Sequence, residues 1–106
     1  MAGTIDLDPA HRAIVLDILA RNVPGREVWA FGSRVNGSAR RFSDLDLTIL
    51  GHEPLTIAQR AALAHEFDES LLPFKVDVGD WCTTDESFRE IVRREHVVLV
   101  SPPGPC

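Results

Sequence analysis

The chain has 106 residues, of which 44% are hydrophobic and 25% are charged, a length and composition typical of one globular domain. The net charge of −5 argues against a protein whose main task is to coat nucleic acid, because such a protein needs a basic surface. No apolar run approaches the about 18–20 residues of a membrane span, and the first residues lack the pattern of a secretory signal. The two cysteines, Cys82 and Cys106, match neither a disulfide framework nor a metal-binding spacing. We therefore expect reduced thiols in a cytoplasmic protein.

The first third of the chain predicts a helix followed by a strand. Asp8-Pro9 marks the helix start, because Asp caps helices and Pro suits the first helical position. Residues 22–25 carry the turn signals that end this helix. Its expected buried stripe comprises Ala10, Ile14, Ile18 and Leu19. Residues 27–31 are rich in strand-forming side chains and predict a short strand.

A connection at residues 32–43 leads to a second strand at residues 44–50. The connection contains Gly and Ser and has room for one helical turn. In the strand, successive side chains point to opposite faces. One face carries Leu45, Leu47 and Ile49, and the other carries Asp44, Asp46 and Thr48.

The second half of the chain predicts two more helices and two more strands. A capping box at Thr56 and Gln59 starts a helix that Pro73 ends, with an inner face of Leu63, Phe67 and Leu71. Residues 74–78 predict the third strand. A capping box at Thr83 and Glu86 predicts the last helix, whose expected stripe is Phe88, Ile91 and Val92. Residues 97–100 predict an edge strand.

Helices and strands alternate, but the link between the first two strands is short. We therefore predict an α/β (α+β) fold, with a small mixed β-sheet of three to four strands and flanking helices. One domain is expected over residues 1–100, followed by a flexible Pro-rich tail at residues 101–106.

Three aspartates are unusual for a sheet of this kind. Asp44 and Asp46 would lie on one face about 6.5–7 Å apart, and two such carboxylates repel each other unless a cation such as Mg²⁺ joins them. Taken alone, the pair favours an explanation without a metal, in which Asp44 caps a turn and Asp46 faces solvent. Asp77 would complete a cluster of three if its strand lay about 4.8 Å from the strand of Asp46. It fits a solvent-facing charge on an edge strand equally well.

The connection before Asp44 has features of a phosphate site. A Gly-Ser turn after a strand, here Gly32-Ser33, can offer backbone N–H groups and a hydroxyl to phosphate oxygens. It is not a Walker loop, because Ser38 replaces the required lysine. Taken alone it favours an ordinary turn. Three arginines, Arg34, Arg40 and Arg41, indicate either a small anionic ligand or a solvated basic face.

The joint pattern is more specific than its parts. Gly-Ser, ten further residues, Asp-x-Asp and a third Asp on a later strand resemble the nucleotidyltransferase superfamily of DNA polymerase β. Residues 32–47 read Gly-Ser-Arg-x-x-Gly-x-Ala-Arg-x-x-Ser-Asp-x-Asp-Leu. This run most resembles the minimal nucleotidyltransferases (MNT proteins) that are paired with HEPN toxins in prokaryotes. The resemblance implies a polymerase β-like nucleotidyltransferase fold.

The resemblance also implies a role for each motif residue. Asp44, Asp46 and Asp77 would bind Mg²⁺, as two ions, with Mn²⁺ as an alternative, and Asp77 would help to deprotonate the acceptor hydroxyl. Gly32 and Ser33 would hold the triphosphate of ATP, the substrate. The other implied phosphate contacts are Arg41 and Ser43.

The implied activity is transfer of AMP from ATP to a tyrosine of a HEPN ribonuclease toxin, which makes the chain an antitoxin in a hetero-oligomer. The chain has no tyrosine, so the acceptor must lie in another chain. Two alternatives remain open. The chain could be a non-catalytic antitoxin that neutralises its toxin by occlusion. It could also be a catalytic subunit that modifies a small molecule together with a helical partner.

Overall fold

In the described part of the chain, four strands form one mixed sheet. The computed structural model describes residues 5–40 and 42–101. The strands are β1 (Val28–Phe31), β2 (Leu45–Ile49), β3 (Val76–Asp80) and β4 (Val97–Val100). Their order in the sheet is β3-β2-β1-β4; β1 is antiparallel to β2 and β4, and β2 is parallel to β3. The predicted fold class and element order are confirmed.

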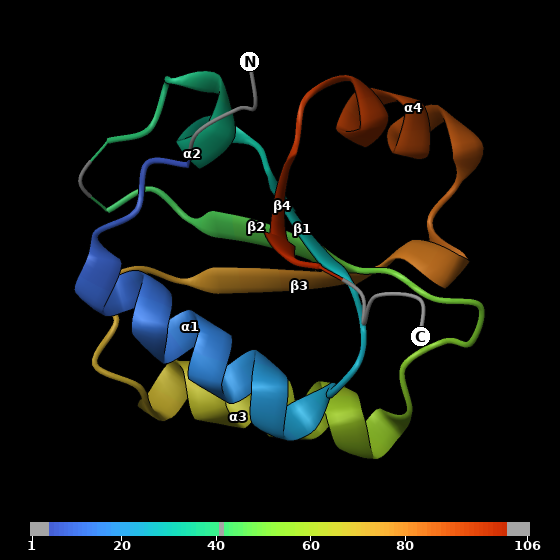
Figure 1. The fold of residues 1–106 in the computed structure, drawn as a ribbon, viewed down its shortest axis with the longest axis horizontal. Helices are drawn as coiled ribbons and strands as arrows, with labels where there is room; N and C mark the ends of the chain where they lie inside the picture. Colours follow the sequence, from blue (N-terminus) through green and yellow to red (C-terminus); the bar gives the residue numbers. More distant parts are fainter. Residues whose placement is uncertain (1–4, 41, 102–106) are drawn as a thin grey trace.

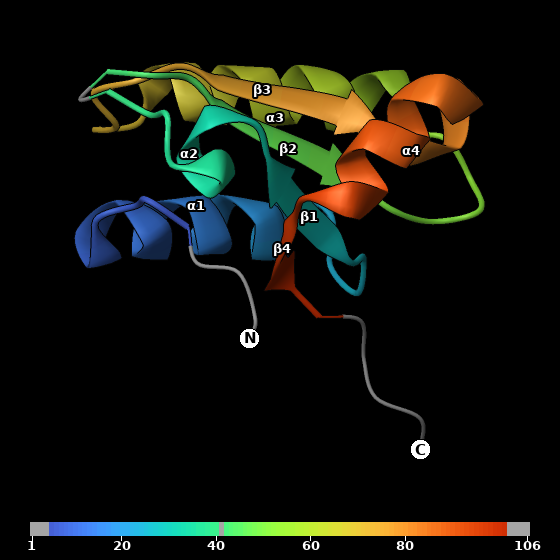
Figure 2. The ribbon, with the colours of Figure 1, turned by 90° about the horizontal axis from the view of Figure 1, so that it is seen from above.

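The helices are divided between the two faces of the sheet. The long helices α1 (Pro9–Asn22) and α3 (Ile57–Glu69) lie side by side on one face (Figure 1). The short helix α2 (Ser33–Asn36) and the helix α4 (Glu86–Arg94), which follows the 3₁₀ turn η1 (Trp81–Thr83), lie at opposite ends of the other face (Figure 2). No helix within residues 5–40 and 42–101 is long and apolar enough to cross a membrane.

The hydrophobic core lies between the sheet and the pair α1 and α3. Its fully buried large side chains come from both layers and are Val15, Leu19, Val28, Leu45, Leu47, Ile49 and Leu63. Leu45, Leu47 and Ile49 are all 0% exposed, so the predicted inner face of β2 is confirmed. Because side chains alternate along a strand, Asp46 has to point to the face that α1 and α3 leave uncovered.

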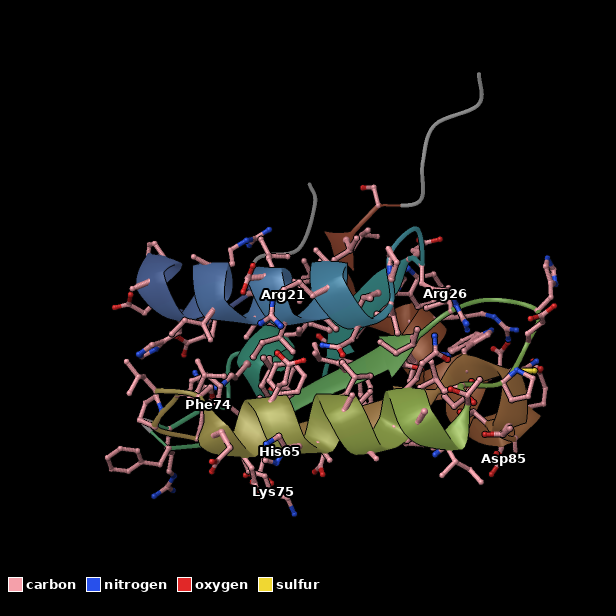
Figure 3. All side chains as sticks on the ribbon, turned by 90° about the horizontal axis from the view of Figure 1, so that it is seen from below. Arg21, Arg26, His65, Phe74, Lys75 and Asp85 are labelled. Atoms are coloured by element: carbon pink, nitrogen blue, oxygen red, sulfur yellow. The ribbon has the colours of Figure 1, made fainter. Side chains whose placement is uncertain are left out.

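Local capping signals fix the starts of the two long helices. The carboxylate of Asp8 accepts a hydrogen bond from the backbone N–H of Ala10 at 2.8 Å. At the start of α3, the predicted capping box of Thr56 and Gln59 is present in both directions. The two helices are then joined side by side, since Arg21 of α1 reaches Glu66 of α3 (Figure 3).

Two predicted stripes are only partly right. In α1, Ala10 is exposed and Val15 is fully buried, because the buried side of the helix is set by how it packs on the sheet. Leu71 is 89% exposed, because α3 ends at Glu69 rather than at Pro73. The hydroxyl of Ser70 donates to the carbonyl of Phe67 at 2.6 Å and so satisfies part of the helix end.

The predicted boundaries around β3 and α4 are also wrong by about two residues. β3 runs to Asp80, whose carboxylate accepts from the N–H of Cys82 and starts the 3₁₀ turn. This turn moves the cap of α4 from Thr83 to Asp85, whose carboxylate accepts from the N–H of Phe88 at 2.9 Å. In the resulting helix Val92 is buried, whereas Phe88 and Ile91 of the predicted stripe are exposed.

Aromatic contacts anchor α4 at one end of the second face. The ring of Trp29 in β1 stacks on His96 at 3.9 Å between centroids and meets Trp81 edge-on at 5.1 Å. Phe31, also in β1, meets Phe88 of α4 edge-on at 5.6 Å. Because Phe31 pairs with Asp46, this last contact brings α4 next to the predicted site at the start of β2.

Candidate functional site

Asp46 and Asp77 are neighbours across two parallel strands. The register of β2 and β3 pairs Asp46 directly with Asp77, and the register of β1 and β2 pairs Asp46 with Phe31. Neighbouring strands are about 4.8 Å apart, so the predicted meeting of the two aspartates is confirmed. Asp44 lies just before β2, two residues from Asp46. The three candidate metal ligands thus gather at the start of β2.

The electrostatics of Asp46 reflect this gathering. Burial raises the pKa of its carboxyl above the ordinary value, and the negative charges of Asp77 and Asp44 raise it further. Asp44 and Asp77 are exposed. Asp77 makes a surface ion pair with Lys75 at 3.9 Å, which water screens. A partly buried carboxylate with two like charges beside it favours a bound cation.

Position 32 requires glycine because of its backbone conformation and its closeness to Asp46. Its φ of +81° and ψ of −154° belong to a region that is essentially restricted to glycine. A Cβ on Gly32 would collide with Oδ2 of Asp46 and lie 3.3 Å from its Cγ. The turn between β1 and α2 therefore passes directly over the aspartate in β2.

The remaining candidate residues lie in the same loop region. Ser33 is the first residue of α2 and is half-buried. The hydroxyl of Ser43 accepts a hydrogen bond from the backbone N–H of Arg40 at 2.8 Å, which closes the turn before Asp44. Arg41 lies outside the described residues. The structure thus brings Gly32, Ser33 and Ser43 to one end of the sheet, next to the acidic cluster.

Two functional-looking residues escaped the sequence analysis. Arg34 is 6% exposed, although its position among three arginines predicted a ligand-binding or solvated side chain. Asp80 is 4% exposed and accepts hydrogen bonds from the N–H of Leu55 at 2.8 Å and from Arg60 at 3.2 Å. No local signal in the sequence marks Arg34 or Asp80 as buried, because the residues that bury them come from other segments of the chain.

The residues present fit Mg²⁺ by their chemistry. Mg²⁺ prefers oxygen ligands and commonly takes one or two carboxylates together with substrate phosphates and water. Within residues 5–40 and 42–101, no three Asp, Glu, His or Cys side chains converge closely enough to hold a metal ion alone. Burial and the neighbouring carboxylates of Asp77 and Asp44 raise the pKa of Asp46, so a bound cation would stabilise its ionised form. The cluster therefore suits an ion that arrives with a phosphate ligand.

A family comparison agrees with this arrangement. Residues 15–103 match the model described as polymerase beta, nucleotidyltransferase. The chain belongs to this nucleotidyltransferase family. The chain is also 50% identical, over 95 residues, to a Haemophilus influenzae protein named probable protein adenylyltransferase MntA. The match covers 90% of this chain and 83% of the relative.

Solved structures of similar fold support the family assignment. A chain of a toxin–antitoxin crystal structure with AMP-PNP is 24% identical, with a TM-score of 0.72, and the match covers 85% of this chain and 73% of that one. A chain from a complex of tri-AMPylated Shewanella oneidensis HEPN toxin with MNT antitoxin is 21% identical, with a TM-score of 0.64. That match covers 85% of this chain and 69% of the other. At these identities the likeness shows the polymerase β-like fold.

Proposed function

We propose that this nucleotidyltransferase is a protein adenylyltransferase that transfers AMP from ATP to a hydroxyl of a HEPN ribonuclease toxin and so acts as an antitoxin. The observation that carries the proposal is the 50% identity to the adenylyltransferase MntA over 90% of the chain. The acidic cluster of Asp44, Asp46 and Asp77 supports the same chemistry. The reaction takes place in the cytoplasm, where a ribonuclease meets its RNA.

The proposed reaction is a displacement at the α-phosphorus of ATP. The acceptor oxygen forms a bond to the α-phosphorus, the bond from this phosphorus to the bridging oxygen of the β-phosphate breaks, and pyrophosphate leaves. The proton of the acceptor hydroxyl passes to Asp77 and then to water. Mg²⁺, as two ions, or Mn²⁺ in its place, would neutralise the charge of the phosphates when bound. Asp44, Asp46 and Asp77 are the residues that would hold it.

The nucleotide would lie over the turn between β1 and α2. Gly32 allows the phosphates to approach the backbone, and Ser33 offers a hydroxyl and an N–H group. Ser43 and Arg41 are the further proposed phosphate contacts. In this arrangement the triphosphate would lie beside the turn and the carboxylates, where its charge and theirs could share the cation.

The acceptor is a separate protein, because this chain contains no tyrosine and its candidate base is accessible. Asp77 lies on β3, an edge strand of the sheet, and its side chain is 56% exposed. A bulky partner can therefore bring a hydroxyl to it without entering an enclosed pocket. Each AMP adds a bulky group and about one negative charge, which repels RNA phosphates near a ribonuclease site.

The alternative that the test has to separate from transfer is inhibition by binding alone. A chain with a non-catalytic site could still cover the active site of its toxin. The two functions differ in whether the toxin changes mass.

The test is to incubate the chain with its HEPN partner, ATP and Mg²⁺, and to measure intact masses and ribonuclease activity. We expect the toxin to gain one or more AMP units and to lose activity. The Asp44→Ala, Asp46→Ala double variant should add no mass and leave the ribonuclease active. Asp17→Ala, which removes an exposed carboxylate on α1, serves as the control and should behave like the wild type. Inhibition by the double variant without a mass change would replace this proposal with occlusion.

A further inference from the structure

Arg34 is a buried arginine whose side chain holds two distant pieces of main chain. Only 6% of the residue is exposed. Its Nε donates to the carbonyl of Ser43 at 3.0 Å, and its Nη1 donates to the carbonyl of Asp6 at 2.9 Å. The backbone N–H of Asp6 in turn donates to the carbonyl of Arg34 at 2.6 Å. The residue is thus fixed between α2, the chain before α1 and the chain before β2.

A third contact reaches the chain before β3. The Cζ of Arg34 lies 4.2 Å from the centroid of the Phe74 ring, a distance typical of a cation–π contact. Phe74 is buried and meets His11 of α1 edge-on at 5.6 Å. It lies between the first turns of α1 and the last turns of α3 (Figure 3). Three residues further along the chain is Asp77.

These contacts connect the separate parts of the candidate site. Arg34 belongs to α2, the helix that begins at Ser33, directly after Gly32. The carbonyl of Ser43 belongs to the peptide bond that precedes Asp44. We infer that Arg34 is a positioning residue, whose guanidinium holds α2, the start of β2 and the chain entering β3 so that Asp46 stays against Gly32 and Asp44 and Asp77 stay near it. The inference rests on the proposed function only in taking these aspartates as metal ligands.

The structure argues against the other role that the sequence allowed for Arg34, a phosphate ligand. Its described hydrogen bonds go to main-chain carbonyls, and its flat face is covered by Phe74. The planar guanidinium donates to two carbonyls and stacks on a ring. Lysine cannot reproduce this, because its ammonium group is a compact charge. Arg40, from the same basic cluster, is exposed and provides a matched control.

The test compares the full-length wild type with Arg34→Met, Arg34→Lys and Arg40→Met. Circular dichroism first establishes that each variant is folded at the assay temperature. Mn²⁺ affinity is then measured by electron paramagnetic resonance with AMP-PNP present and without the partner, because the carboxylates suit an ion that arrives with a phosphate ligand. We expect Arg34→Met to bind Mn²⁺ about tenfold more weakly, as is typical when a residue that orients a metal ligand is lost. Arg34→Lys should fall between Arg34→Met and the wild type, and Arg40→Met should match the wild type.

Transfer kinetics provide the second readout. A shift of about 1 Å in catalytic groups can lower the rate about 100-fold, so kcat of Arg34→Met should fall by about this factor while KM for ATP stays near the wild-type value. A raised KM with unchanged Mn²⁺ affinity would make Arg34 a phosphate ligand and overturn the inference. Wild-type Mn²⁺ affinity and kcat in folded Arg34→Met would overturn it as well.

The remaining outcomes are also decisive. If Arg34→Met does not fold, Arg34→Lys is measured in its place, with the same expected direction. If neither variant folds, Arg34 is a requirement for folding and the inference is wrong. If the wild-type chain transfers no AMP, the proposed function fails, whereas the Mn²⁺ comparison still decides the role of Arg34. A wild-type chain that binds no Mn²⁺ in the presence of AMP-PNP would overturn both.

Discussion

Replacing Gly32 by alanine should slow AMP transfer about 100-fold while most molecules stay folded. The φ of +81° and ψ of −154° at Gly32 are essentially glycine-only, so a side chain there costs about 1–3 kcal/mol. The new Cβ would collide with Oδ2 of Asp46. Because this oxygen is the end of a flexible side chain, the carboxylate moves away and the fold survives. A displacement of about 1 Å lowers the rate about 100-fold, which is the loss of kcat that we expect.

Gly37→Ala separates the backbone effect from the collision. Gly37 has a φ of +86°, close to that of Gly32, but a Cβ there would have no neighbour within 4 Å. This variant should lose about 1–2 kcal/mol of stability and keep wild-type transfer. Urea denaturation gives the stability of both variants, and the AMP gained by the partner over time gives their rates. Equal transfer rates in the two variants would refute the reasoning that places Gly32 against Asp46.

Four further predictions concern single side chains. Burial and like charges raise the pKa of Asp46 above 3.8, so the ionised carboxylate opposes folding at higher pH. Asp46→Asn should therefore match the wild type in urea denaturation at about pH 3, be more stable at about pH 7, and transfer no AMP; equal stability at both pH values would contradict this. Asp80→Ala should lose about 1–3 kcal/mol, because the N–H of Leu55 loses its buried acceptor, yet keep its transfer rate per folded molecule. Asp77→Asn should show the opposite, a stability within about 0.5 kcal/mol of the wild type and no transfer. Leu47→Ala should lose about 2–5 kcal/mol in urea denaturation, as expected for a fully buried leucine.

Features that depend on neighbouring residues could be predicted from the sequence. The capping residue Asp8 and the capping box at Thr56 work within one helical turn, and both are present in the structure. The alternation in β2 follows from the geometry of a single strand, and it placed Asp46 opposite the core. The spacing of Gly-Ser and Asp-x-Asp indicated the nucleotidyltransferase family, which the comparisons confirm. The domain boundaries and the roles of the individual site residues stay predictions.

Features that depend on contacts between distant segments were decided by the tertiary structure. The pairing of Asp46 with Asp77 requires β3 to lie parallel to β2, and the sequence left this open. Asp80 at the end of β3 is buried, and its carboxylate accepts a hydrogen bond from the N–H of Leu55, a residue 25 positions earlier. Arg34 is indistinguishable in the sequence from its exposed neighbour Arg40, yet it is buried because Asp6, Ser43 and Phe74 surround it. The sequence by itself determined which chemical groups the site contains, whereas packing between remote segments determined which of them meet and what holds them in place.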